Sequence, residues 1–194
     1  MRSTTFKEYR GSGVALLVDA LAGLRIAVFR EFPYLYDGEL EYEKRYLREL
    51  SESPDSFVAV VKEGSKIVGA ATALPLRDAD PEFQRPFNDV ESYFYFGESV
   101  LLAPFRGRGI GHEFFDRREA EARRQGFSKT CFCAVVRAQE HPARPRDYRD
   151  LETFWEKRGY RPQAGKTTTF PWLDLGESEE TEKVMQFWER RLSL

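Results

Sequence analysis

Cysteine and histidine are scarce in this chain of 194 residues, which contains two of each. Cys131 and Cys133 lie two positions apart in one predicted strand, and neighbouring positions on one strand face suit buried thiols better than a disulfide. His112 and His141 add too few ligands to complete a zinc site, so we expect no metal. Sparse cysteine also fits a reducing cytoplasm.

The chain also lacks an excess of either charge, with 30 basic residues, 32 acidic residues and a formal net charge of −2. This near-balance gives no general attraction to nucleic acid or to an anionic membrane surface. No apolar run approaches the roughly 20 residues that span a bilayer, and the N-terminus shows no apolar segment of a signal peptide. We therefore expect a cytoplasmic protein without nucleic-acid or membrane partners.

What the chain does contain is the composition of a folded domain. Hydrophobic residues make up 41% of it and aromatic residues 14%, and its length allows a sizeable core. We expect a single domain over residues 1–194. The predicted strands cover residues 4–9, 56–61, 66–74, 92–103, 129–136 and 167–172. The predicted helices cover residues 17–28, 42–50, 110–125, 150–158 and 178–192, the last with Val184, Phe187, Trp188 and Leu192 as its buried stripe.

One stretch combines a buried strand, a glycine-rich turn and a helix. Residues 99–103 run without polar alternation, as in a strand covered on both faces, and Pro104 ends the run because it has no N–H. Gly107, Gly109 and Gly111 permit a tight turn and a close approach of the backbone to a ligand. The stretch therefore predicts a ligand-binding turn before a helix.

The ligand predicted for this turn carries phosphate. Free N–H groups at the start of the following helix attract an anion, and Arg106 and Arg108 add charge suited to phosphate oxygens. A Rossmann fingerprint does not fit, because His112 occupies the place of its third glycine. A P-loop does not fit either, because Gly159 lies one residue too far from Gly165-Lys166-Thr167.

Two motifs resemble those of the GNAT superfamily of N-acetyltransferases. Arg106-x-x-Gly109-x-Gly111, after a strand that ends in Leu102-x-Pro104, is similar to the superfamily's acyl-CoA pyrophosphate loop. Phe154-Trp155-Glu156-Lys157-Arg158-Gly159-Tyr160 is similar to its late helix. The resemblance covers about residues 5–172 and leaves residues 173–194 as an extension. It implies an α/β fold with a mixed, mostly antiparallel sheet and helices on both faces, to which the C-terminal helix would be added.

This resemblance implies an acetyl-CoA-dependent N-acetyltransferase that transfers its acyl group directly to an amine. The central strand would pair with the pantetheine arm, and its divergence from the next strand would free an N–H group as oxyanion donor. The implied CoA-binding residues are Leu101, Leu102, Arg106, Gly107, Arg108, Gly109, Ile110, Gly111 and His112. Two alternatives stay open: another acyl-CoA or an oxygen acceptor, and a catalytically silent CoA-binding regulatory module.

Acetyl transfer to an amine needs a base, because an amine of ordinary pKa is protonated near neutral pH. Glu98 is the candidate, since it is the one acid in the apolar and aromatic strand interior 94–103, where partial desolvation would raise its pKa. The alternatives are that Glu98 pairs with an arginine such as Arg137 or faces solvent. His141, in a loop rich in proline and arginine, is a second candidate base.

The general acid departs from the family pattern. Where the family often has a tyrosine, this chain has Trp155, which cannot donate a proton and is expected to pack. Tyr148 and Tyr160 are the candidate substitutes. The remaining alternative is that no acid is needed, since a thiol pKa near ~8.5 makes the CoA thiolate a tolerable leaving group.

The link between the first two predicted helices borders the acceptor pocket in the family. Here it carries Tyr34, Tyr36 and Asp37, followed by a glutamate-rich helix start. Aromatic faces and carboxylates favour a cation, so we expect a small amine-bearing metabolite, with a basic peptide or protein amine as the alternative. The competing interpretation is that the tyrosines cover the sheet and the glutamates face solvent. The sequence leaves the oligomeric state, including a homodimer, open.

Overall fold

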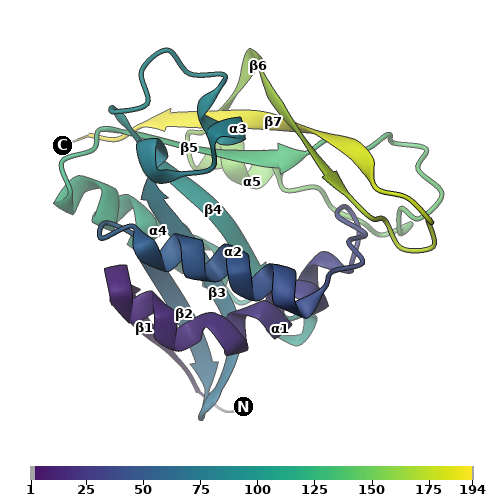
Figure 1. The fold of residues 1–194 in the computed structure, drawn as a ribbon, viewed down its shortest axis with the longest axis horizontal. Coiled ribbons are helices and arrows are strands. Elements are labelled where there is room, and N and C mark those ends of the chain that lie inside the picture. Colours follow the sequence, from purple (N-terminus) through teal and green to yellow (C-terminus); the bar gives the residue numbers. More distant parts are fainter. Residues whose placement is uncertain (1–2, 194) are drawn as a thin grey trace.

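The computed structural model describes residues 3–193, and in this range a seven-stranded sheet lies between two layers of helices (Figure 1). The strands follow the order β1-β2-β3-β4-β5-β7-β6, and all neighbours are antiparallel except β4 and β5. The strands are β1 Thr4–Arg10, β2 Phe57–Glu63, β3 Lys66–Pro75, β4 Tyr93–Leu101, β5 Lys129–Val135, β6 Arg161–Trp172 and β7 Thr181–Arg191. The helices are α1 Val18–Phe29, α2 Leu40–Glu52, α3 Pro81–Gln84, α4 Ile110–Arg124 and α5 Glu152–Lys157. This mixed, mostly antiparallel sheet confirms the predicted fold class.

Hydrophobic residues fill both faces of the sheet, because successive residues of a strand point to opposite faces. Val58 and Val60 of β2 belong to the core that includes α1 and α2, whereas Ala59 and Val61 belong to the core that includes α4. The two cysteines are free, buried thiols on the α1–α2 face, as predicted. The fold thus has two cores that share one sheet.

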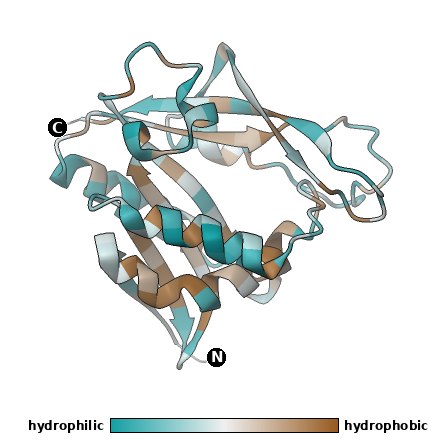
Figure 2. Ribbon diagram, viewed as in Figure 1, coloured by the Kyte–Doolittle hydropathy of each residue, from teal (hydrophilic) through white to brown (hydrophobic). Residues whose placement is uncertain are grey.

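The segment Gly11–Phe29, which ends with α1, is long and apolar enough to cross a membrane by length and composition alone. The prediction that no apolar run approaches that length is therefore wrong. In the fold, Val14, Leu21 and Leu24 of this segment are buried in the α1–α2 core, and Figure 2 shows the brown, apolar colour of α1 where it lies along the sheet. A helix that packs its apolar side on a sheet can be as long and as apolar as one that crosses a membrane.

The C-terminal segment is a strand, β7, and not the predicted helix. It lies between β5 and β6 and pairs with both along most of its length. The helical spacing was misleading, because Val184 is 45% exposed whereas the alternate residues Lys183, Met185 and Phe187 are buried. Alternate burial is the pattern of a strand, and pairing on both edges outweighs the apolar spacing. The segment therefore forms part of the sheet.

Strands β4 and β5 separate soon after they begin to pair. Their parallel register runs only from Tyr93 to Tyr95 of β4. Figure 1 shows β5 and β7 crossing the view at a large angle to β3 and β4. The remainder of β4 is paired with β3 on one side and has left β5 on the other, as the resemblance implied.

A bulge in β4 coincides with this separation. The register between β3 and β4 shifts between Ala71 and Ala73, opposite Gly97 and Glu98. One extra residue reverses the alternation of side chains along the strand. Glu98 and Val100 therefore share the α1–α2 face, on which Glu98 would not lie in an unbroken strand.

Candidate active site

The predicted phosphate turn joins the end of β4 to the start of α4. Gly107 and Gly109 have φ angles of +72° and +80°, a conformation that glycine adopts without strain. A Cβ at either position would meet no atom within 4 Å, so this backbone faces open space. The amides of Ile110 and Gly111, at the start of α4, have no acceptor within the helix. The turn therefore has the geometry of an anion site formed by backbone.

The side chains of the turn differ in their contacts. Arg106 donates from Nη1 to Glu31 at 2.6 Å, so its charge is partly compensated. Arg108 lies over the ring of Phe105, with its guanidinium carbon 5.2 Å from the ring centre. His112 is exposed on the first turn of α4. Arg108 is accordingly the cation of the turn that is more available to a phosphate.

Both residues predicted to pair with pantetheine have part of their backbone engaged, and the Leu101 carbonyl accepts from Arg106 Nε at 3.0 Å. The Leu102 amide donates to the carbonyl of Val68 at 3.0 Å, and the Leu102 carbonyl accepts from Phe105 at 2.9 Å. In an antiparallel ladder the bonding direction alternates from residue to residue. The amides of Leu101 and Ser99 therefore point away from β3, toward the opening that β5 leaves.

Glu98 is 8% exposed and forms an ion pair. Its Oε1 lies 2.6 Å from Arg25 Nη1, and its Oε2 accepts from the Tyr46 hydroxyl at 3.3 Å. Glu98 does pair with an arginine, but Arg137 is the wrong partner, because Arg137 binds Asp174. As a base, Glu98 would act while its carboxylate contacts Arg25 and Tyr46.

Arg25 is shared between two carboxylates. Besides Glu98, it binds Glu43 of α2 through Nε, and its guanidinium lies over the Tyr46 ring at 4.3 Å. Burial alone would lower the pKa of Arg25, but the carboxylates of Glu98 and Glu43 raise it well above its usual value. Glu43 is 0% exposed. We call Arg25, Glu43 and Glu98 the buried triad.

Tyr34, on the link between α1 and α2, reaches toward the triad. Burial raises the pKa of Tyr34, and Arg25 and Glu98 lie near enough for their charges to act on it. Its ring stacks on Trp172 with centroids 5.9 Å apart. The side chain therefore covers the sheet and borders the cluster at the same time.

The other two predicted acceptor residues point to different partners. Burial, followed by the charge of Glu43, raises the pKa of Tyr36, which places its hydroxyl beside the triad. Asp37 is exposed and pairs with Arg30 at 2.9 Å. The tyrosines therefore approach the buried triad, whereas the Asp37 carboxylate is engaged at the surface.

The structure contradicts Tyr160 as general acid. Tyr160 is 0% exposed in the core on the α4 face, where its hydroxyl contacts Thr130 Oγ1 at 3.0 Å and Glu119 Oε1 at 3.2 Å. Burial also raises its pKa. Sequence reasoning placed it next to the motif but could not show its direction. Trp155 packs against Phe132, as predicted.

Tyr148 and His141 remain candidates by position. The Tyr148 ring meets Phe32 edge-on at 4.7 Å, and the His141 ring lies 5.8 Å from Phe32. Phe32 begins the segment that carries Tyr34. Burial raises the pKa of Tyr148, so this hydroxyl stays protonated near neutral pH. Both side chains therefore lie beside the link that carries Tyr34.

Arg118 of α4 holds the bulge from the opposite face of the sheet. Its Nη1 donates to the carbonyls of Glu98 at 3.3 Å and Thr72 at 3.4 Å, and its Nη2 donates to Ser99 Oγ at 2.8 Å. Burial lowers the pKa of Arg118 to about 10, which leaves it charged at neutral pH. The helix that begins at the phosphate turn thus fixes the strand that carries Glu98.

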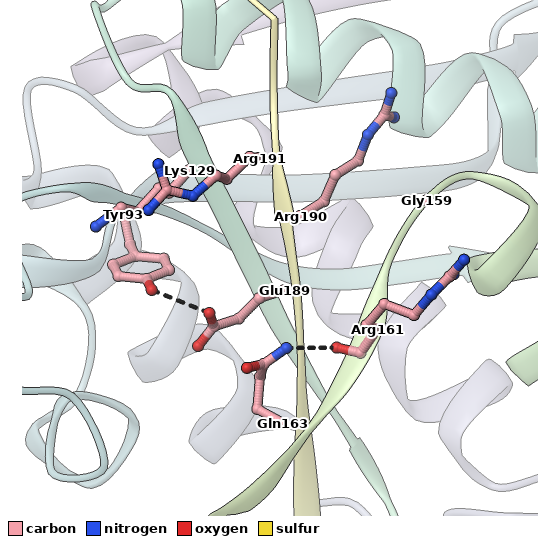
Figure 3. Close-up of a pocket in the computed structure, with 8 residues that line it drawn as sticks. All are labelled: Tyr93, Lys129, Gly159, Arg161, Gln163, Glu189, Arg190 and Arg191. Atoms are coloured by element: carbon pink, nitrogen blue, oxygen red, sulfur yellow. Dashed lines mark hydrogen bonds between the residues drawn. The ribbon is translucent and has the colours of Figure 1, made fainter.

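A separate surface pocket of about 340 Å³ lies beside β5, β6 and β7 (Figure 3). Its lining includes Tyr93, whose hydroxyl donates to Glu189 at 3.0 Å, together with Lys129 and Arg191. Lys166 also pairs with Glu189. None of the predicted site residues lines this pocket, and its carboxylate is satisfied within the protein.

Sequence reasoning missed Arg25, Tyr46 and Arg118, and it considered Glu43 only as one of the glutamates at the start of the second helix. One signal was present: Arg25 falls on the helical face of Leu21, in an otherwise apolar segment. A charge at such a position predicts a buried partner, because an unpaired buried charge is costly. The identity of that partner follows only from the packing of α1 on β4 and α2.

The sequence matches a known protein family. Residues 21–151 match the acetyltransferase (GNAT) family, which is more than half of the chain. No curated protein matches the sequence. The matched range contains the phosphate turn, Arg25, Glu43 and Glu98.

Solved structures share the fold at low sequence identity. A ribosomal-protein-alanine N-acetyltransferase from Brucella melitensis is 14% identical, with a TM-score of 0.63 over 97% of this chain and 99% of that one. The yncA protein of Salmonella typhimurium, solved with its cofactor acetyl-CoA, is 13% identical, with a TM-score of 0.60 over 98% and 94%. An acetyltransferase from Thermus thermophilus is 16% identical, with a TM-score of 0.61 over 99% and 100%.

Proposed function

Because the chain belongs to the GNAT family of acetyltransferases, we propose that it transfers the acetyl group of acetyl-CoA directly to an amine. One observation carries this proposal. A backbone anion site at the start of α4 and a buried glutamate on β4 both lie beside the opening where β4 and β5 separate. The first suits the pyrophosphate of CoA, and the second suits proton removal from an amine. The acetyl-CoA in the Salmonella relative supports the choice of donor.

The proposed path of the donor follows β4. The amides of Leu101 and Ser99 face the opening and are free to bind the pantetheine arm and the thioester carbonyl. Arg118 binds the carbonyl of Glu98, which belongs to the same peptide group as the Ser99 amide. A cation at the carbonyl end polarises that peptide group and makes its N–H a stronger donor to a developing oxyanion.

The proposed chemistry removes two protons from the acceptor nitrogen. Glu98 accepts a proton from the acceptor's ammonium group, and the freed nitrogen lone pair attacks the thioester carbon. The tetrahedral intermediate breaks its C–S bond, so the electron pair leaves with sulfur as a thiolate. The proton of the new amide nitrogen passes to that thiolate or to water. Tyr148 is the hydroxyl placed at the acceptor side that could supply a proton to sulfur.

We propose a small amine-bearing metabolite as acceptor. Two carboxylates and one arginine give the buried triad a net negative charge when all are ionised, and Tyr34 and Tyr36 add aromatic faces nearby. A protein or peptide amine is the second candidate, which the name of the Brucella relative favours. The free thiols of Cys131 and Cys133 support action in the reducing cytoplasm.

A turnover assay tests the proposal. Release of CoA thiol from acetyl-CoA is measured with a panel of amines, basic peptides and alcohols, and mass spectrometry identifies the acetylated product. We expect acetamide formation with amines. Faster turnover of a longer acyl-CoA, or an ester product, would replace the acetyl or amine assignment. Calorimetric binding of CoA without any turnover would establish the regulatory module instead.

A further inference from the structure

The buried triad contains one more carboxylate than its single guanidinium neutralises. Arg25 is 9% exposed, Glu98 8% and Glu43 0%. Arg25 Nη1 lies 2.6 Å from Glu98 Oε1, while Nε binds Glu43 Oε2. Glu43 Oε1 is buried and has no hydrogen-bond partner among the described residues. Two carboxylates from different elements therefore share one buried guanidinium.

We propose that Arg25 is a positioning residue that sets the basicity of Glu98, and that Glu43 tunes this basicity by sharing the same guanidinium. The inference rests on the proposed acetyltransferase function. An arginine that served Glu98 alone would favour its ionised form and make it a weak base. A second carboxylate on the same guanidinium offsets part of that charge, so less of it acts on Glu98.

The surroundings of Glu98 leave Glu43 as the group that decides this balance. The charged and titratable groups that approach the triad are Arg25 on α1, Glu43 and Tyr46 on α2, Tyr34 and Tyr36 on the link, Cys133 on β5 and Arg118 on α4. Burial raises the pKa of the three tyrosines, and raises that of Cys133 to about 12, so these four groups stay neutral. Arg118 binds the main chain of Glu98 and not its carboxylate.

Charge sharing predicts opposite effects for two substitutions. Glu43→Gln leaves Arg25 to Glu98 alone, so the acid limb of the kcat–pH profile should move to lower pH by about one unit, with a lower plateau. Arg25→Gln removes the cation, so the acid limb should move to higher pH by about one unit or more. Arg124→Gln is the matched control, because Arg124 pairs with the buried Glu121 away from the triad; its acid limb should stay in place.

Two further measurements keep the proposal testable. If Arg25→Gln does not fold, Arg25→Lys keeps the charge without the two-pronged geometry; it should leave the midpoint near that of the wild type and lower kcat. The NMR signal of the Glu98 carboxyl carbon is assigned by its disappearance in Glu98→Gln. Its titration midpoint is then measured in the same variants, which requires no turnover. Absence of acetyl transfer by the wild type would refute the proposed function, while the NMR midpoints would still decide the charge sharing. Midpoints that move in the same direction, or do not move, overturn the inference.

Discussion

Arg137 binds Asp174 through both terminal nitrogens, with Nη1–Oδ2 at 2.8 Å and Nη2–Oδ1 at 2.9 Å. The same guanidinium donates to the carbonyls of Pro33 and Tyr34, each at 2.8 Å. One side chain therefore ties the loop after β5 and the β6–β7 turn to the link that carries Tyr34. The shape of the proposed acceptor side depends on this two-pronged pair.

Arg137→Lys keeps the charge but cannot form the paired hydrogen bonds to a carboxylate. We expect the KM of the amine to rise about tenfold, because a looser link positions Tyr34 less well. The KM of acetyl-CoA should stay the same, since the phosphate turn lies elsewhere. Steady-state kinetics with Arg146→Lys, an exposed position of the same loop, provide the control. An equal rise in both KM values would mean that Arg137 acts on the whole fold.

Gly109→Ala tests the phosphate turn against a glycine of the same backbone conformation. Gly109 and Gly165 have φ of +80° and +77°, and a Cβ at either would meet no protein atom within 4 Å. Both substitutions should cost a similar ~1 kcal/mol of stability. In calorimetry, CoA affinity should fall at least tenfold for Gly109→Ala and stay unchanged for Gly165→Ala. Equal affinities would place the CoA site away from the turn.

Glu98→Gln removes the proposed base with little change in volume. We expect kcat to fall about 10²–10⁴-fold, the usual contribution of a general base, with CoA affinity nearly unchanged. The acid limb of the pH–rate profile should disappear with it. An acid limb that survives in Glu98→Gln would transfer the role to His141 or to a water relay.

Tyr34 and Asp37 should differ in their effect on the acceptor. Tyr34 borders the buried triad, while Asp37 pairs with Arg30 at the surface. Tyr34→Ala should therefore raise the KM of the amine several-fold, and Asp37→Asn should raise it less, with the KM of acetyl-CoA unchanged in both. A larger effect of Asp37→Asn would show that the amine displaces Arg30.

Glu121 should make the free energy of unfolding depend on pH in the acid range. Burial opposes its ionisation, but hydrogen bonds from Arg124, Arg10 and Gln125 outweigh burial and lower the pKa of Glu121 from 4.5 to about 2. A depressed pKa stabilises the fold above pH 4.5, and this stabilisation disappears as the pH falls toward about 2. Urea denaturation should show a shallower loss of stability in this window for Glu121→Gln. A slope identical to that of the wild type would contradict this role.

Local patterns in the sequence were enough to predict most of the elements and the phosphate turn. The turn depends on glycines that adopt positive φ and on a helix start, which are properties of adjacent residues. The isolation of Glu98 in an apolar strand also marked it as unusual. The last strand could not be recognised, because Lys183 is buried with its ammonium donating to the Trp172 carbonyl at 2.9 Å. A lysine at a buried position conceals the alternation that would have indicated a strand.

The tertiary structure alone decided which groups surround Glu98. The bulge opposite Thr72 turns its side chain toward α1, and that bulge is a property of the register between two strands. Arg25 and Glu43 then meet Glu98 from two helices that are distant from it in sequence. No local pattern specifies such a contact, because it depends on the packing of helices against the sheet. The sequence by itself determined that one acid interrupts an apolar strand, and only the fold determined that this acid is buried and which groups share its charge.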